Sequence, residues 1–310
     1  MINTSLAYNK FIKLIRNGVY TMTDKKNDYI QFMVMKKLYK DGNKQVYLLS
    51  NKNGYKKGKL PIKHSLNIGE VIKIEDSLDG TIDISDFEEV KKFNLEDYLP
   101  SVKRPINDIM SDIEAISNEC IISEAGRKLN DYFFNDENFL DKFTHGIGGV
   151  SMHHNYIGGL AEHTLNVMYL TKVLCDRYNC RRREIAVLSA KLHDIGKLYE
   201  LDYNGPFKYT LQGELEGHIV IGIQMIDRAF EHIDYPFDED FIRRIKGCIA
   251  QHHGKLEYGS PRACNMEESF ILNFADTVDA TMNKIEQIKE DTESNSWSEY
   301  DRRIETKLYL

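Results

Sequence analysis

The spacing of apolar residues changes near residue 106, and this change constrains the fold more than any other feature of the chain. From there onward apolar residues recur every three or four positions, as on one face of a helix. Before it, short apolar runs alternate with turn residues, which is typical of strands. The chain is therefore predicted to be multidomain α+β, with an N-terminal small β-barrel (OB-like) followed by an all-α domain.

The strand-rich region spans residues 19–85 and is also rich in basic and aromatic residues. Its apolar runs include 29–35, 45–49 and 70–74, with turn residues at 40–43, 51–54 and 67–69 between them. Short strands of this composition fit a five-stranded OB-fold. Tyr29, Phe32, Tyr39, Tyr47 and Tyr55 are interleaved with lysines, as a groove that stacks single-stranded nucleic acid requires. The alternative interpretation is that half of these aromatic residues belong to the core.

Helical spacing predicts five helices in the second part of the chain. They cover residues 160–174, 185–195, 219–230, 241–249 and 270–285, and the second is expected to end near Gly196. Residues 86–105 contain Pro100 and Pro105 and are predicted to be a linker or a domain edge. The final stretch is polar with a lone Trp297, so it is predicted to be either a docking tail or partly disordered.

Charge is distributed unevenly along the chain. The formal net charge is −7, but residues 1–75 hold 15 Lys or Arg and only 5 Asp or Glu. This asymmetry favours a polyanion as the partner of the first segment, although a lysine-rich solvated surface would look the same. The five cysteines form no C-x-x-C pair, and no apolar run is long enough for a membrane span or a secretory signal. A cytoplasmic protein that contacts no membrane is therefore expected.

The histidines are concentrated beside glycines at the ends of the predicted helices. A set of imidazoles and carboxylates without thiolates suits divalent Mn, Fe, Zn, Ni or Co. A carboxylate in an adjacent His-Asp pair can bridge two such metals, which can then activate a water for attack on a phosphoryl group. The set comprises His163, His193, Asp194, His218, His252, His253 and Asp276.

The order H…HD…H…HH…D resembles the HD superfamily, whose all-helical domain binds metals and usually hydrolyses phosphate esters. The resemblance implies one metal held by His163, His193, Asp194 and Asp276. It implies a second metal held by Asp194, His218, His252 and His253, with Asp194 bridging the two.

Four stretches resemble the YhaM-type 3′–5′ exoribonucleases more closely. They are HHNYIGGLAEHT at 153–164, LHDIGKLYEL at 192–201, GHIVIG at 217–222 and HHGKLEYGSP at 252–261. The resemblance implies an OB-fold joined to an HD domain, two Mn²⁺ ions, single-stranded RNA or DNA as substrate, and a homo-oligomer. Residues 142–147 and the tail after Asp291 depart from the family pattern, which bears on the substrate more than on the metal chemistry.

With this resemblance the chain divides into four parts. Residues 1–95 are expected to be a basic OB-like nucleic-acid-binding domain, and 96–135 a linker and helical connection. Residues 136–290 are expected to be the HD metal-dependent phosphohydrolase domain, and 291–310 a C-terminal tail.

Four residues are expected to act in catalysis or to support it. Asp194 would bridge the metals, and Lys197 would face the phosphate or else be a cation at a helix C-terminus. His154 would contact the substrate or protonate the leaving group, unless it is a turn residue bonded to backbone. Asp279 shares a helix face with Asp276 and would orient a metal ligand.

Three alternatives stay open at the level of sequence. An HD enzyme could act on a small nucleotide, although the residues after His253 lack the D-G-x-G-Y-P run of the cyclic-dinucleotide subfamily. The chain could be a non-catalytic module that binds single-stranded nucleic acid, but it retains all seven ligand-type residues. The basic segment could bind a protein or a membrane, but no basic amphipathic helix is evident.

Overall fold

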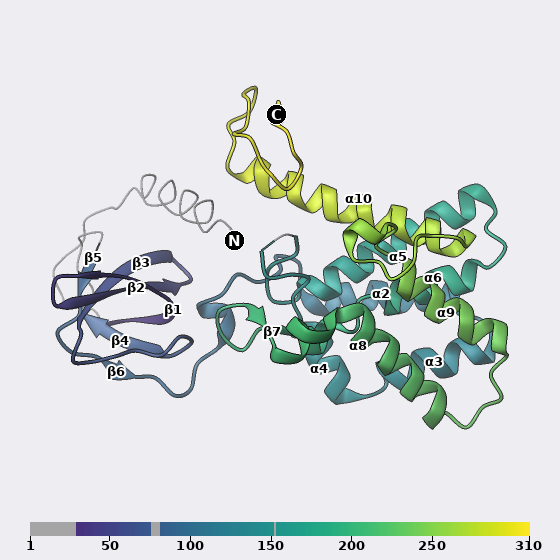
Figure 1. Ribbon diagram of the computed structural model, residues 1–310, viewed down its shortest axis with the longest axis horizontal. Helices are drawn as coiled ribbons and strands as arrows, with labels where there is room; N and C mark the ends of the chain where they lie inside the picture. Colours follow the sequence, from purple (N-terminus) through teal and green to yellow (C-terminus); the bar gives the residue numbers. More distant parts are fainter. Residues whose placement is uncertain (1–28, 76–80, 152) are drawn as a thin grey trace. The chain divides into compact units, whose positions relative to one another are not determined.

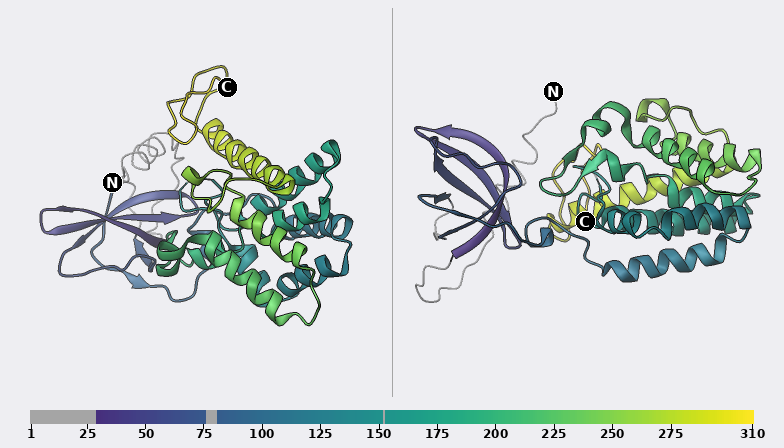
Figure 2. Two further views of the ribbon diagram at one scale, coloured as in Figure 1. Left: turned by 45° about the vertical axis from the view of Figure 1, so that its right-hand side comes forward. Right: turned by 90° about the horizontal axis from the view of Figure 1, so that it is seen from below.

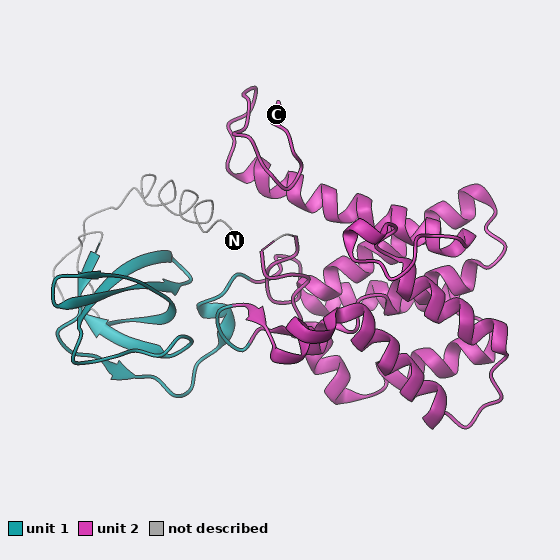
Figure 3. Ribbon diagram, in the orientation of Figure 1, with its two compact units in different colours: residues 1–100, 204–206 teal, residues 101–203, 207–310 magenta. Residues whose placement is uncertain are grey.

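The computed structural model describes residues 29–75, 81–151 and 153–310, and the chain divides into two compact units (Figure 3). The first comprises residues 1–100 with 204–206 and is called the sheet unit below. The second comprises residues 101–203 and 207–310 and is called the helical unit. Parts of the predicted strand region, residues 19–28 and 76–80, lie outside the described residues.

The sheet unit contains one six-stranded mixed sheet in the order β5-β3-β2-β1-β4-β6 (Figure 1). Every pairing is antiparallel except that of β3 with β5. Within residues 29–75 and 81–100, no pairing joins β5 to β6, so the predicted barrel is observed as a sheet with two edges. The strands are β1 (Tyr29–Asp41), β2 (Lys44–Asn51), β3 (Gly54–Pro61), β4 (Val71–Glu75), β5 (Thr81–Asp83) and β6 (Glu88–Glu89).

Of the five aromatic residues predicted to share one groove, two are buried in the core of the sheet unit and three are exposed. Phe32 and Tyr47 are each only 1% exposed and pack among Leu, Ile and Val side chains. The Tyr47 hydroxyl also accepts a hydrogen bond from the backbone N–H of Leu66. Tyr29, Tyr39 and Tyr55 are exposed, so three of the five aromatic rings can meet a ligand.

The helical unit is built from nine helices of the described residues, with α6 packed against α2, α3, α5, α9 and α10 (Figures 1 and 2). Side chains cap several of these helices at their N-termini: Ser123 caps α3, Asp136 caps α4, Thr210 caps α8 and Asp238 caps α9. The helices are α2 (Ile106–Cys120), α3 (Glu124–Phe134), α4 (Glu137–His145), α5 (Gly159–Tyr178), α6 (Arg183–Leu192), α7 (Lys197–Glu200), α8 (Leu211–His232), α9 (Glu239–Gln251) and α10 (Glu267–Glu290).

The five predicted helices correspond to α5, α6, α8, α9 and α10, each with different ends. The difference that matters most for the site is at α6. This helix ends at Leu192 rather than near Gly196, so His193 and Asp194 follow it in a turn. Short elements complete the unit, so it is not purely helical. They are the strands β7 (Leu201–Asp202) and β8 (Lys208–Tyr209) and the 3₁₀ turn η2 (Leu256–Tyr258), while a second such turn, η1 (Leu95–Asp97), ends the sheet unit.

One apolar core runs through the helical unit and includes the segment expected to be a linker. Ile109 and Ile113 of α2 and Leu129 and Phe133 of α3 are buried in the same cluster as α5, α6 and α9. Residues 106–134 are therefore part of the helical unit and do more than connect. None of the described helices is long and apolar enough to cross a membrane.

The polar tail after α10 is folded back on itself rather than disordered. Antiparallel bridges join Trp297 to Tyr309 and Asp301 to Thr306. Arg303 donates a hydrogen bond to the side chain of Gln287 on α10, at 2.6 Å, which ties the tail to the end of that helix.

Candidate metal centre

Seven side chains that lie far apart in the sequence meet in the interior of the helical unit. They come from five places: α5, the turn after α6, α8, the end of α9 and α10. Their donor atoms form groups whose members all lie within 4.8 Å of one another. Three of these groups are His163, His193 and Asp276; His218, His252 and His253; and His193, Asp194 and His252.

Asp194 lies between the two halves of this cluster. Its Oδ2 is 3.3 Å from Nε2 of both His163 and His193. Its Oδ1 is 3.5 Å from Nε2 of His218 and 3.7 Å from Nε2 of His252. Within the described residues, Oδ1 of Asp194 and Nε2 of His252 are buried without a hydrogen-bond partner. Because such atoms are costly to bury alone, their placement fits residues that hold a cation.

The early end of α6 produces this geometry. His193 and Asp194 lie in the turn between α6 and α7 instead of on a continuing helix, so their side chains both reach the cluster. Gly196 packs so closely on α8 that a Cβ there would clash with the carbonyl oxygen of His218. Gly217, at φ 73°, interrupts α8 immediately before His218. These two glycines bring His218 to Asp194.

Hydrogen bonds hold the five imidazoles with Nδ1 outward and Nε2 toward the centre. A neutral ring whose Nδ1 faces a carbonyl oxygen must carry its proton there, which leaves a lone pair on Nε2. Three backbone contacts of 2.8 Å have this form: His193 with Ala190, His252 with Ile249 and His253 with Tyr258.

Two carboxylates anchor the other two imidazoles. Asp279 accepts a hydrogen bond from Nδ1 of His163 at 2.6 Å, as its position on the face of Asp276 predicted. Glu200, which the sequence analysis missed, accepts hydrogen bonds from Nδ1 of His218 at 3.1 Å and from its backbone N–H at 3.0 Å. Carboxylates in this position are the usual outer partners of metal-binding histidines. Glu200 lies two residues after Leu198 in the stretch LHDIGKLYEL, and this position was the sequence feature that could have identified it.

Comparison with known proteins agrees with this arrangement. The HD domain model matches residues 160–281, a range that contains all seven residues. This segment is an HD domain. HD domains bind divalent metals, and the His and Asp clusters here could hold such ions. The match with the HD superfamily predicted from the sequence is thereby confirmed.

Similar proteins share a single name. The chain is 34% identical over 157 residues to "3′-5′ exoribonuclease YhaM" of Geobacillus sp. (strain WCH70), a match that covers 51% of this chain and 48% of that protein. It is 28% identical over 221 residues to the protein of that name from Bacillus subtilis (strain 168), covering 71% and 69%. For Listeria innocua the identity is 30% over 161 residues, covering 52% and 51%.

The match spans about half the length of the Geobacillus and Listeria relatives. The resemblance to YhaM-type exoribonucleases is confirmed at this level of identity. No solved structure gives a significant match to the chain.

Electrostatics within the HD domain favour charged carboxylates and, for some rings, neutral imidazoles. Burial would raise the pKa of Asp194, but the charges of Lys197 and His193 hold it well below its usual range. Burial and the neighbouring His253 and His193 lower the pKa of His252 well below its usual range. For His163 burial is outweighed by three carboxylate hydrogen bonds, which raise its pKa. A bound cation would displace a proton from such a ring, because metal ligands bind in their deprotonated form.

Lys197 lies inside the HD domain cluster. Its Nζ is 2.6 Å from Oδ2 of Asp194, and the side chain is 9% exposed. It is the first residue of the four-residue helix α7 and also its basic residue in the last turn, so the alternative interpretation as a cation at a helix C-terminus stays a prediction.

His154 does not lie where a substrate contact was expected. Its Nε2 is 2.7 Å from Oδ2 of Asp279, its Nδ1 is 2.9 Å from the Tyr156 hydroxyl, and it is 1% exposed. Both ring nitrogens therefore contact other side chains, and a direct role in protonating the leaving group stays a prediction that these contacts do not favour. The alternative interpretation of His154 as a turn residue agrees better with these contacts, although the partners of its ring are side chains rather than backbone groups.

Proposed function

We propose that this protein is a metal-dependent 3′–5′ exoribonuclease that hydrolyses phosphodiester bonds of single-stranded RNA. The observation that supports this most strongly is the set of five anchored imidazoles around Asp194, inside an HD domain whose relatives carry that name. The same chemistry would serve single-stranded DNA.

Two divalent cations would be held with Asp194 between them. His163, His193 and Asp276 would complete the first ligand set, and His218, His252 and His253 would complete the second. The ligand atoms fit metal ions for two reasons. The Nε2 atoms of the five histidines face the cluster, and Oδ1 of Asp194 and Nε2 of His252 are buried without a hydrogen-bond partner among the described residues. Mn²⁺ is the proposed ion, and nitrogen and oxygen donors of this kind also suit Fe, Zn, Ni or Co.

The chain's own residues would position the phosphodiester and offset its charge. Bound cations would supply a nucleophilic water at neutral pH and polarise the phosphoryl group. Lys197 would exchange its contact with Asp194 for one with a phosphoryl oxygen, where its charge offsets the charge that develops in the transition state. Asp279 and Glu200 would hold the ligand rings in the productive tautomer.

The sheet unit would hold the RNA upstream of the bond that is cleaved. Lys36, Lys37 and Lys40 are exposed on β1 on either side of the exposed Tyr39. Alternating cations and aromatic rings suit a single strand, because the cations meet phosphates and the rings stack on bases. RNA binding by this unit should therefore weaken as salt rises.

The test uses one RNA labelled at its 3′ end and the same RNA labelled at its 5′ end, each incubated with the full chain and Mn²⁺. A 3′–5′ exonuclease releases the 3′ label at once as a mononucleotide and shortens the 5′-labelled RNA stepwise. Chelator and Asp194→Asn should abolish both, while Asp234→Asn, which alters an exposed carboxylate outside the cluster, should not. Turnover of a small phosphodiester with intact RNA would overturn the proposal.

A further inference from the structure

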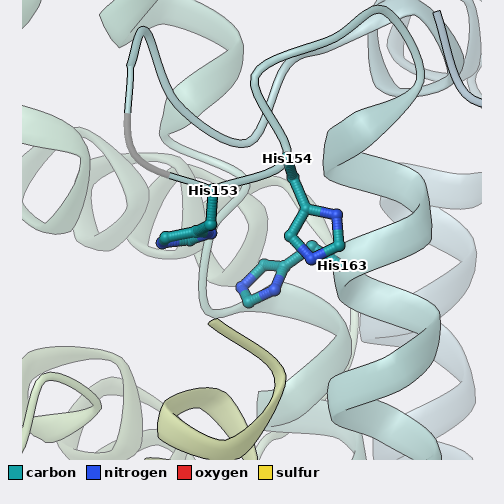
Figure 4. Close-up of side chains that lie close together, drawn as sticks. All are labelled: His153, His154 and His163. Carbon is teal, nitrogen blue, oxygen red and sulfur yellow. The ribbon is translucent and has the colours of Figure 1, made fainter. Parts of the chain in front are cut away.

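Two adjacent histidines in the loop before α5 lie on different sides of His163 (Figure 4). The ring centroid of His163 is 5.4 Å from that of His153 and 5.2 Å from that of His154. A donor atom from each of the three residues lies within 4.8 Å of the others. This loop lies outside the segment that matches the HD domain model.

These three rings do not form a third metal site. The nitrogens of His154 contact Asp279 and Tyr156, and Nδ1 of His163 also contacts Asp279. The remaining His163 nitrogen, Nε2, faces Asp194 and Asp276 at 3.3 Å. Two of the three rings thus have no nitrogen left for an additional cation.

His154 is fixed from several directions. Its backbone N–H donates to Oδ1 of Asn283 at 2.9 Å, and its carbonyl accepts from the N–H of Gly148 at 2.9 Å. Its φ of 47° is rare for a residue other than glycine. Gly159 packs on it so closely that a Cβ there would clash with the His154 carbonyl oxygen. Because this conformation is held by its surroundings, it also fixes where the preceding residue points.

His153 has a buried nitrogen without a partner. Its Nδ1 makes no hydrogen bond within the described residues. Its ring centroid lies 5.4 Å from that of His163, which places it beside the cluster. A ring nitrogen left unmatched beside a reaction centre suits a group that pairs with the substrate.

We propose that His153 is a substrate-contacting residue, which hydrogen-bonds a phosphoryl oxygen of the 3′-terminal nucleotide beside His163. His154, by contrast, is a positioning residue: it contacts Asp279, which in turn holds the ring of His163. The two neighbours thus divide the functions that a single histidine was expected to have. The inference rests on the proposed function, because it assumes a phosphodiester at this site.

The experiment compares His153→Ala with His154→Ala in the full chain by two binding measurements. The first is titration with Co²⁺, followed by its visible absorption, and the second is binding of 5′-AMP to Mn²⁺-saturated protein. His153→Ala should leave Co²⁺ affinity within about twofold and weaken 5′-AMP about 10- to 100-fold, as expected for one lost hydrogen bond to a charged group. His154→Ala should weaken Co²⁺ binding about 10- to 100-fold.

A third variant, His153→Asn, keeps an N–H donor near the position of Nδ1 and should recover part of the 5′-AMP affinity. Equal loss of Co²⁺ affinity in both alanine variants would overturn the proposal, as would unchanged 5′-AMP affinity in His153→Ala. Hydrolysis of bis(p-nitrophenyl) phosphate, measured alongside, separates the two hypotheses. Intact RNA with active small-ester hydrolysis contradicts the exoribonuclease, while the binding pattern still decides the role of His153.

Discussion

The sheet unit and the helical unit differ in where their charged and polar side chains lie. The main core cluster of the sheet unit is apolar, and the lysines of β1 lie at its surface. The helical unit buries His163, His193, Asp194 and His252, and Oδ1 of Asp194 and Nε2 of His252 have no hydrogen-bond partner among the described residues. Burying charged and unpaired groups costs stability. Under the proposed function, the helical unit would accept this cost to hold metal ions, whereas the exposed lysines of the sheet unit would contact RNA.

Removing the carboxylate of Asp194 should have the largest effect, because it would abolish the metal binding proposed for the helical unit. Asp194→Ala removes a carboxylate that lies close to both ligand sets, so metal content and hydrolysis should fall together. We expect a loss of activity on the order of 1000-fold, since one preorganised electrostatic contact alone is worth 100- to 1000-fold. Metal analysis and the RNA assay measure the two effects. Full activity with normal metal content would show that Asp194 does not bridge the sets.

Variants of the anchoring carboxylates should have the next largest effect. Asp279→Asn and Glu200→Gln remove the charges that hold His163 and His218, and each should weaken metal affinity about 10- to 100-fold. Asp279→Asn should act on the first ligand set and Glu200→Gln on the second. Competition with a chelator of known affinity measures both. If neither variant changes metal binding, the hydrogen bonds are structural only.

Metal should stabilise the helical unit and not the sheet unit. An ion at 100 times its dissociation constant adds about 2.7 kcal/mol to the free energy of unfolding. For a domain of this size we expect a rise in Tm of about 5–10 °C. Calorimetry with and without Mn²⁺ measures the shift, and hydrogen exchange assigns it to a unit. Protection that rises equally in β1–β4 would contradict the contrast between the two units.

Charge on the sheet unit should affect RNA binding by the smallest amount. Lys37→Gln with Lys40→Gln removes two exposed cations, and each phosphate contact contributes about 0.7 to the slope of log affinity against log salt for single strands. The slope should fall by about 1.4, while hydrolysis of a small phosphodiester stays unchanged. The matched control is Lys37→Arg with Lys40→Arg, which keeps both charges. An unchanged slope would place RNA binding elsewhere.

Local patterns in the sequence predicted the helices, and they identified seven side chains that the structure brings together. The spacing around Leu160 and Phe270 predicted α5 and α10, because helix periodicity is a property of neighbouring residues. The order of His and Asp identified the seven side chains, since their types and spacing were sufficient for the HD resemblance.

Other features depended on contacts between distant segments. Sequence alone could not decide whether Tyr47 or Tyr39 is buried, because both lie in similar strand patterns and only packing separates them. The place of Glu200 in LHDIGKLYEL did not reveal which group it binds, since its contact with His218 arises from the approach of α8 to α7.

The sequence by itself determined which residues could make a metal centre, because donor chemistry belongs to each side chain. The tertiary structure decided how each one is used. His153 and His154 are chemically identical neighbours, yet one has both nitrogens engaged by Asp279 and Tyr156 and the other keeps a buried nitrogen without a partner among the described residues. Their difference comes from a backbone φ of 47° and from α10. Neither is encoded in the local pattern, so only the assembled fold distinguishes them.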